Sequence, residues 1–274
     1  MKKAKMLMLI LTSSVLALTP VAASAAEEVS SQTTSTVTDA PTVTPTPVPQ
    51  KKGWITLKSG KKKYFRDGRN VTGFQKIGKY YYYFSAKGTL LKNKTIKKGY
   101  KGFTYFIDSK GRVMGRQKGS VYYTASGKKM NQAQIADLRS KQIVAEITNS
   151  RMSKPAKLQA CFNWVIKGYY NIWRRFDQGG KNWPAAFAND HFLYRKGDCI
   201  SDAAAFGYLA KAIGYKNVYV CADAVRSNNN AHSWTEINGL VYDPLFAEAK
   251  SYSKYYGCSY GSYGLSAILK YKLS

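Results

Sequence analysis

The stretch RKGDCISDAAAFGYLAKAIGY, residues 195–215, decides the fold of the second half of the chain. It predicts a buried helix that begins after Asp198, a good N-cap residue, and ends at Gly214, a natural C′ residue. The apolar face of this helix consists of Ala203, Phe206, Ala210 and Ile213. Cys199 then lies in the first turn, where unpaired backbone N–H groups favour a thiolate, although the Asp198 carboxylate opposes it. Cys199 is a candidate nucleophile that position alone does not establish.

A thiol nucleophile needs a base, and the base needs a group that orients it. The chain has two histidines. His191 lies in ANDHFLYRKGDC, where nothing indicates a strand or a partner. His232 lies in AHSWTEINGLVYDPLF, whose Asn-Gly dipeptide at 238–239 predicts a β-hairpin with a two-residue turn. His232 is therefore the stronger candidate for the base.

The register of this hairpin brings an acid to the histidine. A two-residue turn pairs Ile237 with Leu240, and side chains alternate between the two faces along each strand. Asp243 then shares a face with His232, one diagonal step away, at roughly 7–8 Å between backbones. An imidazole and a carboxylate can span that gap with a hydrogen bond. The spacing therefore predicts a His232–Asp243 pair.

The order Cys199, His232, Asp243, in the phrases KGDC, HSW and VYDP, resembles the transglutaminase-like superfamily over residues 155–247. The resemblance implies a papain-like α+β fold with a Cys-His-Asp site. Two other classes of wall-associated cysteine enzymes, the NlpC/P60 and CHAP types, also place a cysteine at the start of a helix. Their histidine is not usually followed by a hairpin that ends in Asp-Pro, so the transglutaminase-like reading is preferred.

The resemblance implies acyl transfer without a cofactor or metal. Cys199 attacks an amide carbonyl, His232 takes and returns the proton, and Asp243 holds the imidazole tautomer. The Cys199 N–H is one expected oxyanion donor, and an upstream side chain, Trp183 or Tyr194, is a candidate for the second. A zinc site formed by the same three residues would lack a fourth ligand in the local sequence.

The first 50 residues predict export. MKKAKMLMLILTSSVLALTPVAASAAEE has a basic start, an apolar stretch and a small-residue cleavage site, which together predict a signal peptide at residues 1–25. The apolar stretch is too short and too polar for a membrane anchor, and no second apolar segment follows. Residues 26–50, rich in Thr, Ser, Pro and Val, predict a semi-extended linker.

Residues 51–130 contain a repeat. GKKKYFRDGRNVTGF, GKYYYYFSAKGTLL and YKGFTYFIDSKGRVMG, followed by a degenerate GSVYYTASGKKM, each combine paired aromatic residues with a turn glycine. The turn glycines are Gly68, Gly88, Gly111 and Gly127. Each unit predicts a β-hairpin too small to be stable alone, so the units are expected to stack in an all-β, β-solenoid-like array.

The charge of the chain lies mostly on these repeats. The net charge is +28, and residues 51–130 hold 22 lysines or arginines against two acidic residues. With GW at 53–54, TG at 72–73 and tyrosine–phenylalanine pairs, the repeats resemble the cell-wall-binding repeats of Gram-positive surface proteins, which include choline-binding modules. Trp54 is their one tryptophan, and the basic surface favours an anionic wall polymer, teichoic acid or peptidoglycan, over choline. Export argues against a nucleic-acid partner.

Helices are expected at 131–148 and 153–170, the second with Ser153 as N-cap. Cys161 falls on the apolar face of the second helix and is expected in the core. A disulfide among Cys161, Cys221 and Cys258 is left open.

The predicted fold class is thus multidomain: an all-β hairpin array at 51–130, then an α+β papain-like, transglutaminase-like domain at 131–274. The predicted protein is a secreted cysteine acyl-transfer enzyme at the cell wall or cell surface. It is expected to hydrolyse amide bonds of surface proteins or wall peptides, with a protein or peptide as substrate. The alternatives are a cross-linking transglutaminase and an inactive wall-binding scaffold.

Overall fold

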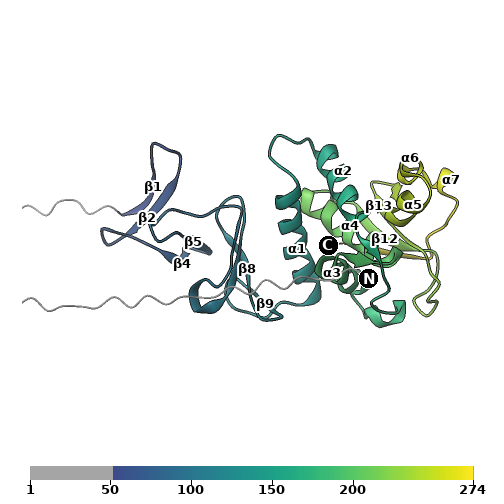
Figure 1. Ribbon diagram of the computed structural model, residues 1–274, viewed down its shortest axis with the longest axis horizontal. Helices are drawn as coiled ribbons and strands as arrows, with labels where there is room; N and C mark the ends of the chain where they lie inside the picture. The colour runs from purple at the N-terminus through teal and green to yellow at the C-terminus, as the bar shows by residue number, and fades with distance from the viewer. Residues whose placement is uncertain (1–51, 274) are drawn as a thin grey trace, which may run out of the picture. The chain divides into compact units, whose positions relative to one another are not determined.

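The computed structural model describes residues 52–273, and all of them fall in one compact unit. The predicted signal peptide and linker lie outside the described residues. Antiparallel hairpins come first in the described chain, and helices packed on a five-stranded sheet follow (Figure 1). Among the helices of residues 52–273, none combines the length and hydropathy that crossing a membrane requires.

The hairpin region, residues 52–130, forms three separate antiparallel sheets. Its strands are β1 (Gly53–Thr56), β2 (Lys62–Arg66), β3 (Arg69–Asn70), β4 (Gly73–Ile77), β5 (Tyr80–Phe84), β6 (Lys94–Ile96), β7 (Thr104–Ile107), β8 (Val113–Lys118) and β9 (Val121–Thr124), with a 3₁₀ turn η1 (Tyr100–Gly102). The order is β1-β2-β3, β4-β5 and β6-β7-β8-β9. The predicted hairpins are present, but the separate sheets do not confirm a solenoid.

All four predicted turn glycines have positive φ values, from 71° to 107°. At Gly111 the neighbouring repeat adds a second constraint, because a Cβ there would lie 2.8 Å from the Leu90 side chain. In two of the four units the second strand shrinks to a single bridge, Phe84 with Leu90 and Tyr123 with Lys129. Some of the aromatic residues form small cores between these sheets, since Phe84 and Tyr105 are fully buried, whereas Trp54, Tyr80 and Tyr100 are exposed.

Four longer helices follow: α1 (Gln132–Ile147), α2 (Lys154–Val165), α3 (Trp183–Tyr194) and α4 (Cys199–Ile213). Asn131 and Gln134 form a capping box at α1, and Ser153 caps α2 as expected. The prediction that α2 continues to residue 170 was wrong. It ends at Val165, and after Gly168 the chain forms a short strand, β10 (Tyr169–Tyr170), which pairs with β11 (Lys196–Gly197).

The five-stranded antiparallel sheet has the order β15-β14-β13-β12-β16. Its strands are β12 (Val218–Ala222), β13 (Ser233–Ile237), β14 (Leu240–Tyr242), β15 (Tyr256–Cys258) and β16 (Leu269–Lys272). The short elements around it are η2 (Phe176–Gly179), α5 (Pro244–Ala249), α6 (Tyr252–Tyr255) and α7 (Tyr260–Tyr263). Helix α4 lies against β12 and β13 (Figure 1). Its buried alanines allow this approach, and Thr235 Oγ1 donates a 2.7 Å hydrogen bond to the Ala203 carbonyl.

Candidate active site

Cys199 is the first residue of α4. Asp198 caps the helix, its Oδ1 accepting a 2.8 Å hydrogen bond from the Ser201 N–H, and Gly214 ends it with a φ of 104°. The predicted bounds of the helix are thus confirmed. The Cys199 thiol is half-buried and donates to the Ala231 carbonyl oxygen at 3.5 Å. Because α4 packs against β13, the thiol lies beside Ala231, two residues before that strand begins.

The hairpin of β13 and β14 has the predicted register. Ile237 pairs with Leu240, and Asn238 and Gly239 both have positive φ in the two-residue turn. The ladder ends at Tyr242, and Asp243 leaves the strand to become the N-cap of α5.

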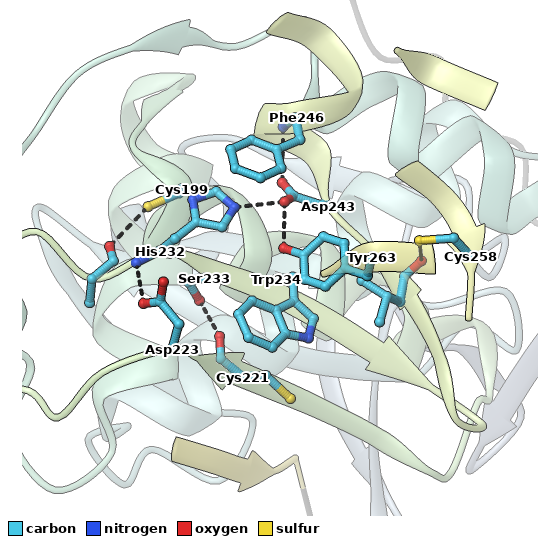
Figure 2. Close-up of polar contacts among 12 residues, drawn as sticks. Cys199, Cys221, Asp223, His232, Ser233, Trp234, Asp243, Phe246, Cys258 and Tyr263 are labelled. Atoms are coloured by element: carbon cyan, nitrogen blue, oxygen red, sulfur yellow. Dashed lines mark hydrogen bonds and ion pairs between the residues drawn. The ribbon is translucent and has the colours of Figure 1, made fainter. Parts of the chain in front are cut away.

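The acid and the base meet across this hairpin (Figure 2). His232 Nε2 lies 2.6 Å from Asp243 Oδ2. The Asp243 side chain is fully buried, and it also accepts a 2.7 Å hydrogen bond from the Tyr263 hydroxyl and a 2.9 Å hydrogen bond from the Phe246 N–H. Three donors thus hold one buried carboxylate, which compensates for the cost of removing it from water.

Further contacts fix both the imidazole ring and the backbone of His232. The Phe246 ring stacks on His232 with centroids 4.0 Å apart and planes 14° apart. Asp223 Oδ1 accepts a 2.7 Å hydrogen bond from the His232 N–H, and the Asp223 N–H donates to the His232 carbonyl at 3.1 Å. Phe246, Asp223 and Tyr263 escaped the sequence analysis, since only packing brings them to the histidine.

The thiol lies on the free side of the imidazole. It contacts the carbonyl oxygen of Ala231, the residue directly before His232. Figure 2 shows the sulfur and the Asp243 carboxylate on opposite sides of the ring. Because Asp243 accepts from Nε2–H, Nδ1 is left with a lone pair for the thiol proton. Cys199, His232 and Asp243 form one cluster, and their catalytic roles stay a prediction.

Comparison with known proteins identifies this part of the chain. Residues 141–247 match the family model of the transglutaminase-like superfamily. They form a transglutaminase-like domain. A search of the curated proteins gives no match.

Several solved structures from Streptococcus pneumoniae match the hairpin repeats. The choline binding domain of Spr1274 is 22% identical over 23% of this chain and 92% of its own, with a TM-score of 0.21. Choline binding protein F is 23% identical over 30% and 28%, with a TM-score of 0.23. CbpJ from strain TIGR4 is 24% identical over 30% and 29%, with a TM-score of 0.23. This chain thus covers less than a third of the length of choline binding protein F and of CbpJ.

Burial opposes thiolate formation in the transglutaminase-like domain. Burial, and after it the charge of Asp198, raise the pKa of the Cys199 thiol well above its usual range. Both effects disfavour the thiolate, so a position in the first turn does not by itself establish an activated sulfur. A nucleophilic role for this thiol would therefore require a base that takes its proton.

The second histidine belongs to a separate pair. His191 Nδ1 lies 2.8 Å from Asp202 Oδ1, and both side chains are buried. The sequence around His191 gave no indication of this partner. Asp202 lies on α4 and His191 on α3, so this contact depends on how the two helices pack and is invisible in the local sequence. Burial raises the pKa of Asp202, and the neighbouring His191 side chain opposes that rise.

The two residues expected as candidates for a second oxyanion donor, Trp183 and Tyr194, lie in different environments. Trp183 is buried against Phe176 and Phe187, in the core. Tyr194 is exposed and stacks on Trp173 with centroids 4.1 Å apart. Burial, and after it the charge of a Cys199 thiolate, raises the pKa of Tyr170, which pairs with Gly197 two residues before the cysteine.

All four cysteines are free thiols. Cys161 is in the core as expected, and Cys221 is buried in β12. Within residues 52–273 no group of three or more His, Cys, Asp or Glu side chains is arranged to hold a metal ion.

The cysteines are expected to differ sharply in alkylation by iodoacetamide. Burial raises the pKa of Cys161 to about 12 and that of Cys221 to about 11, so both should stay unmodified in the folded protein. Cys199 should react below the free-thiol pKa of about 8.5 only if His232 accepts its proton. Mass spectrometry of each cysteine against pH, in the wild type and in His232→Ala, measures this. A Cys199 that reacts only above pH 9 in both proteins contradicts the thiol–imidazole pair.

Proposed function

We propose that the chain is an exported, wall-retained cysteine acyl-transfer enzyme. Residues 1–25 are its signal peptide, 26–50 its linker, 51–130 its wall-binding repeats and 131–274 its catalytic domain. Cys199 is the nucleophile, His232 the general base and Asp243 the group that orients the base. The observation that carries the proposal is the imidazole of His232, with Asp243 on its Nε2 side and the thiol on its other side.

The proposed reaction follows from this arrangement. The Cys199 S–H turns from the Ala231 carbonyl to Nδ1 of His232, and sulfur attacks the carbonyl carbon of an amide. The oxyanion accepts a hydrogen bond from the Cys199 N–H, which is unpaired at the helix start. The C–N bond then breaks, His232 returns the proton to the leaving amine, and a thioester remains. Asp243 accepts from Nε2–H throughout and stabilises the imidazolium.

We infer that hydrolysis is the main outcome, because water is always available to resolve the thioester. The test uses the full mature chain with N,N-dimethylcasein as amide donor and dansylcadaverine as labelled amine. Ammonia or new amino termini without label support a hydrolase. Incorporation of label that Cys199→Ala abolishes supports a cross-linking transglutaminase. No reaction from this donor or from a panel of wall peptides supports the inactive scaffold.

The hairpin region supports an anionic wall polymer as its ligand. Cations of the chain itself already lie over several of its aromatic rings. The Arg116 guanidinium lies 4.8 Å from the Phe103 centroid and 5.6 Å from that of Phe74, and the Arg112 guanidinium lies 5.2 Å from that of Tyr80. A quaternary ammonium would compete with these groups for the same π-faces. The proposed ligands are therefore teichoic acid or peptidoglycan rather than choline.

Binding to purified wall teichoic acid is expected to weaken at least about tenfold between 50 and 500 mM NaCl, because the exposed lysines and arginines act through screened charge. The measurement is a dissociation constant from sedimentation or calorimetry. Choline chloride is the control at matched ionic strength, and it should act as NaCl does. Displacement by choline at low millimolar concentration would show that the repeats recognise a quaternary ammonium.

A further inference from the structure

A polar cleft of about 690 Å³ lies between the hairpin region and helix α1. One wall consists of β6 and the turn between β7 and β8, and the other consists of α1, the start of α2 and the chain between them. Buried contacts hold the two walls together, because Phe106, Tyr122 and Leu138 form one hydrophobic cluster. Arg139 Nη2 also donates a 2.6 Å hydrogen bond to the Tyr122 hydroxyl. The cleft is therefore preformed.

The cleft is remote from the candidate nucleophile. Ala212, near the C-terminal end of α4, lines it, whereas Cys199 is the first residue of that helix. At a rise of 1.5 Å per residue, the two positions lie about 20 Å apart along the helix. The cleft is therefore separate from the candidate active site, and the proposed reaction gives it no role.

The cleft carries cations that the chain itself does not neutralise. The cationic side chains that line it are Lys94, Arg112, Lys141 and Lys157. Asp108 neutralises Arg112 at 2.8 Å, and Asp137 neutralises Lys141. Among the described residues, the ammonium groups of Lys94 and Lys157 pair with no carboxylate, although Lys157 is half-buried. In the same range Glu146 is the one acidic lining residue that pairs with no cation, so two unpaired cations face one carboxylate.

The neutral part of the lining suits a hydroxylated anion. Asn93, Ser109, Asn149 and Ser150 supply amide and hydroxyl groups, and none of the described residues that line the cleft is aromatic. A quaternary ammonium is bound by aromatic faces, and the sugar rings of a glycan strand also stack on them. Amide and hydroxyl groups beside ammonium groups instead match phosphates joined by polyol units, because they can bond both the phosphate oxygens and the polyol hydroxyls.

We propose that this cleft binds a polyol-phosphate chain, with phosphate groups on Lys94 and Lys157 and polyol hydroxyls on the neighbouring amide and hydroxyl groups. The inference rests on the proposed function: it gives the anionic wall polymer a binding site and favours a teichoic acid over a peptidoglycan strand. Lys94 belongs to β6 and Lys157 to α2, so the polymer is held by the hairpin region and by the helical part of the chain together. An acidic peptide has the same charge but lacks the polyol hydroxyls.

The test measures the affinity of the full mature chain for a synthetic glycerol-phosphate hexamer by isothermal titration calorimetry. The salt is about 100 mM NaCl, where charges act over about 10 Å. Lys94→Ala combined with Lys157→Ala should weaken binding by about tenfold or more, since each removes a charge-assisted contact to phosphate. The matched control combines Lys58→Ala with Lys216→Ala, two exposed lysines outside the cleft. It has the same net charge and should weaken binding by less than about threefold.

Two further variants separate a local site from general charge. Glu146→Gln removes the unpaired carboxylate and should tighten binding by about two- to threefold. Ala145→Trp changes no charge but places an indole in the cleft from an exposed position on α1, so it should weaken binding while the fold is kept. Circular dichroism checks the fold of each variant. In the wild type the hexamer should also slow acetylation of Lys94 and Lys157, but not of Lys58 or Lys216, as read by mass spectrometry.

Four results would overturn the proposal. Unchanged affinity in the cleft variants, or binding of purified wall teichoic acid without binding of the hexamer, would place the polymer elsewhere and leave the proposed wall retention standing. Poly-L-glutamate that binds as tightly as the hexamer, with the same loss in the lysine variant, would assign the cleft to an acidic peptide. Tighter binding to phosphatidylglycerol vesicles, lost in that variant, would assign it to a lipid headgroup. Failure of both the hexamer and purified teichoic acid to bind would count against the proposed wall ligand, and the inference would fall with it.

Discussion

Cys199→Ala is expected to abolish thioester formation and to lower kcat/KM for any amide substrate by about 10⁴-fold or more, as removal of a nucleophile does in other acyl-transfer sites. No other described thiol can replace it, because Cys161 and Cys221 are buried and Cys258 donates to the Val241 carbonyl at the far side of the hairpin. The measurement is amine release or label incorporation under matched conditions.

Cys258→Ala is the matched control for this prediction. It removes another partly buried thiol, in β15, and should leave the activity within about twofold of the wild type, since a distant partly exposed side chain contributes little. Equal activity in Cys199→Ala and the wild type would show that the chemistry lies elsewhere. Equal loss in both variants would indicate that thiol removal acts through the fold.

Asp243→Asn is expected to lower kcat by about 10³- to 10⁴-fold, because the amide reverses the tautomer of His232. If the Asn NH₂ faces the ring, it donates to Nε2, so Nδ1 carries the proton and cannot accept one from the thiol. The substitution also disturbs the hydrogen bonds that Asp243 accepts from Tyr263 and from the start of α5. We therefore expect a loss of stability of about 1–3 kcal/mol as well. Rate and chemical denaturation are measured on the same preparation.

Asp223→Asn makes the same chemical change at the carboxylate that accepts a hydrogen bond from the His232 backbone N–H. Its amide oxygen can still accept the hydrogen bond from the His232 N–H, so the loss of kcat should stay below about tenfold. Tyr263→Phe removes one of the donors to Asp243 and should give an intermediate loss. If Asp243→Asn costs no more than Asp223→Asn, the carboxylate does not act by orienting the imidazole.

Part of the site could be predicted because it depends on local rules. Helix caps and apolar spacing place Cys199 at the start of α4, since Asp198 and Gly214 act through their own backbones. A two-residue Asn-Gly turn admits one register, and strand alternation then brings Asp243 to the face of His232. Each of these rules involves residues fewer than about twenty positions apart, over which backbone geometry leaves few alternatives.

The same reliance on local rules explains why α2 was predicted to continue to residue 170. Helical spacing continues through Tyr169 and Tyr170, but the chain ends the helix at Val165 because β11, nearly thirty residues later, pairs with these tyrosines. Tertiary pairing overrode the local preference. That override created β10, whose two tyrosines are exposed and whose partner strand ends two residues before Cys199.

Within the described residues, the sequence by itself determined the hairpin repeats, the helix that carries Cys199 and the His232–Asp243 hairpin. The tertiary structure alone decided which side chains hold that pair. Phe246, Tyr263 and Asp223 reach it from separate elements, and His191 turned out to bind Asp202. It also decided the raised pKa of Cys199, because desolvation depends on what surrounds a group in space. Neighbours along the chain set backbone geometry, whereas burial and side-chain contacts are set by segments that meet only when the chain folds.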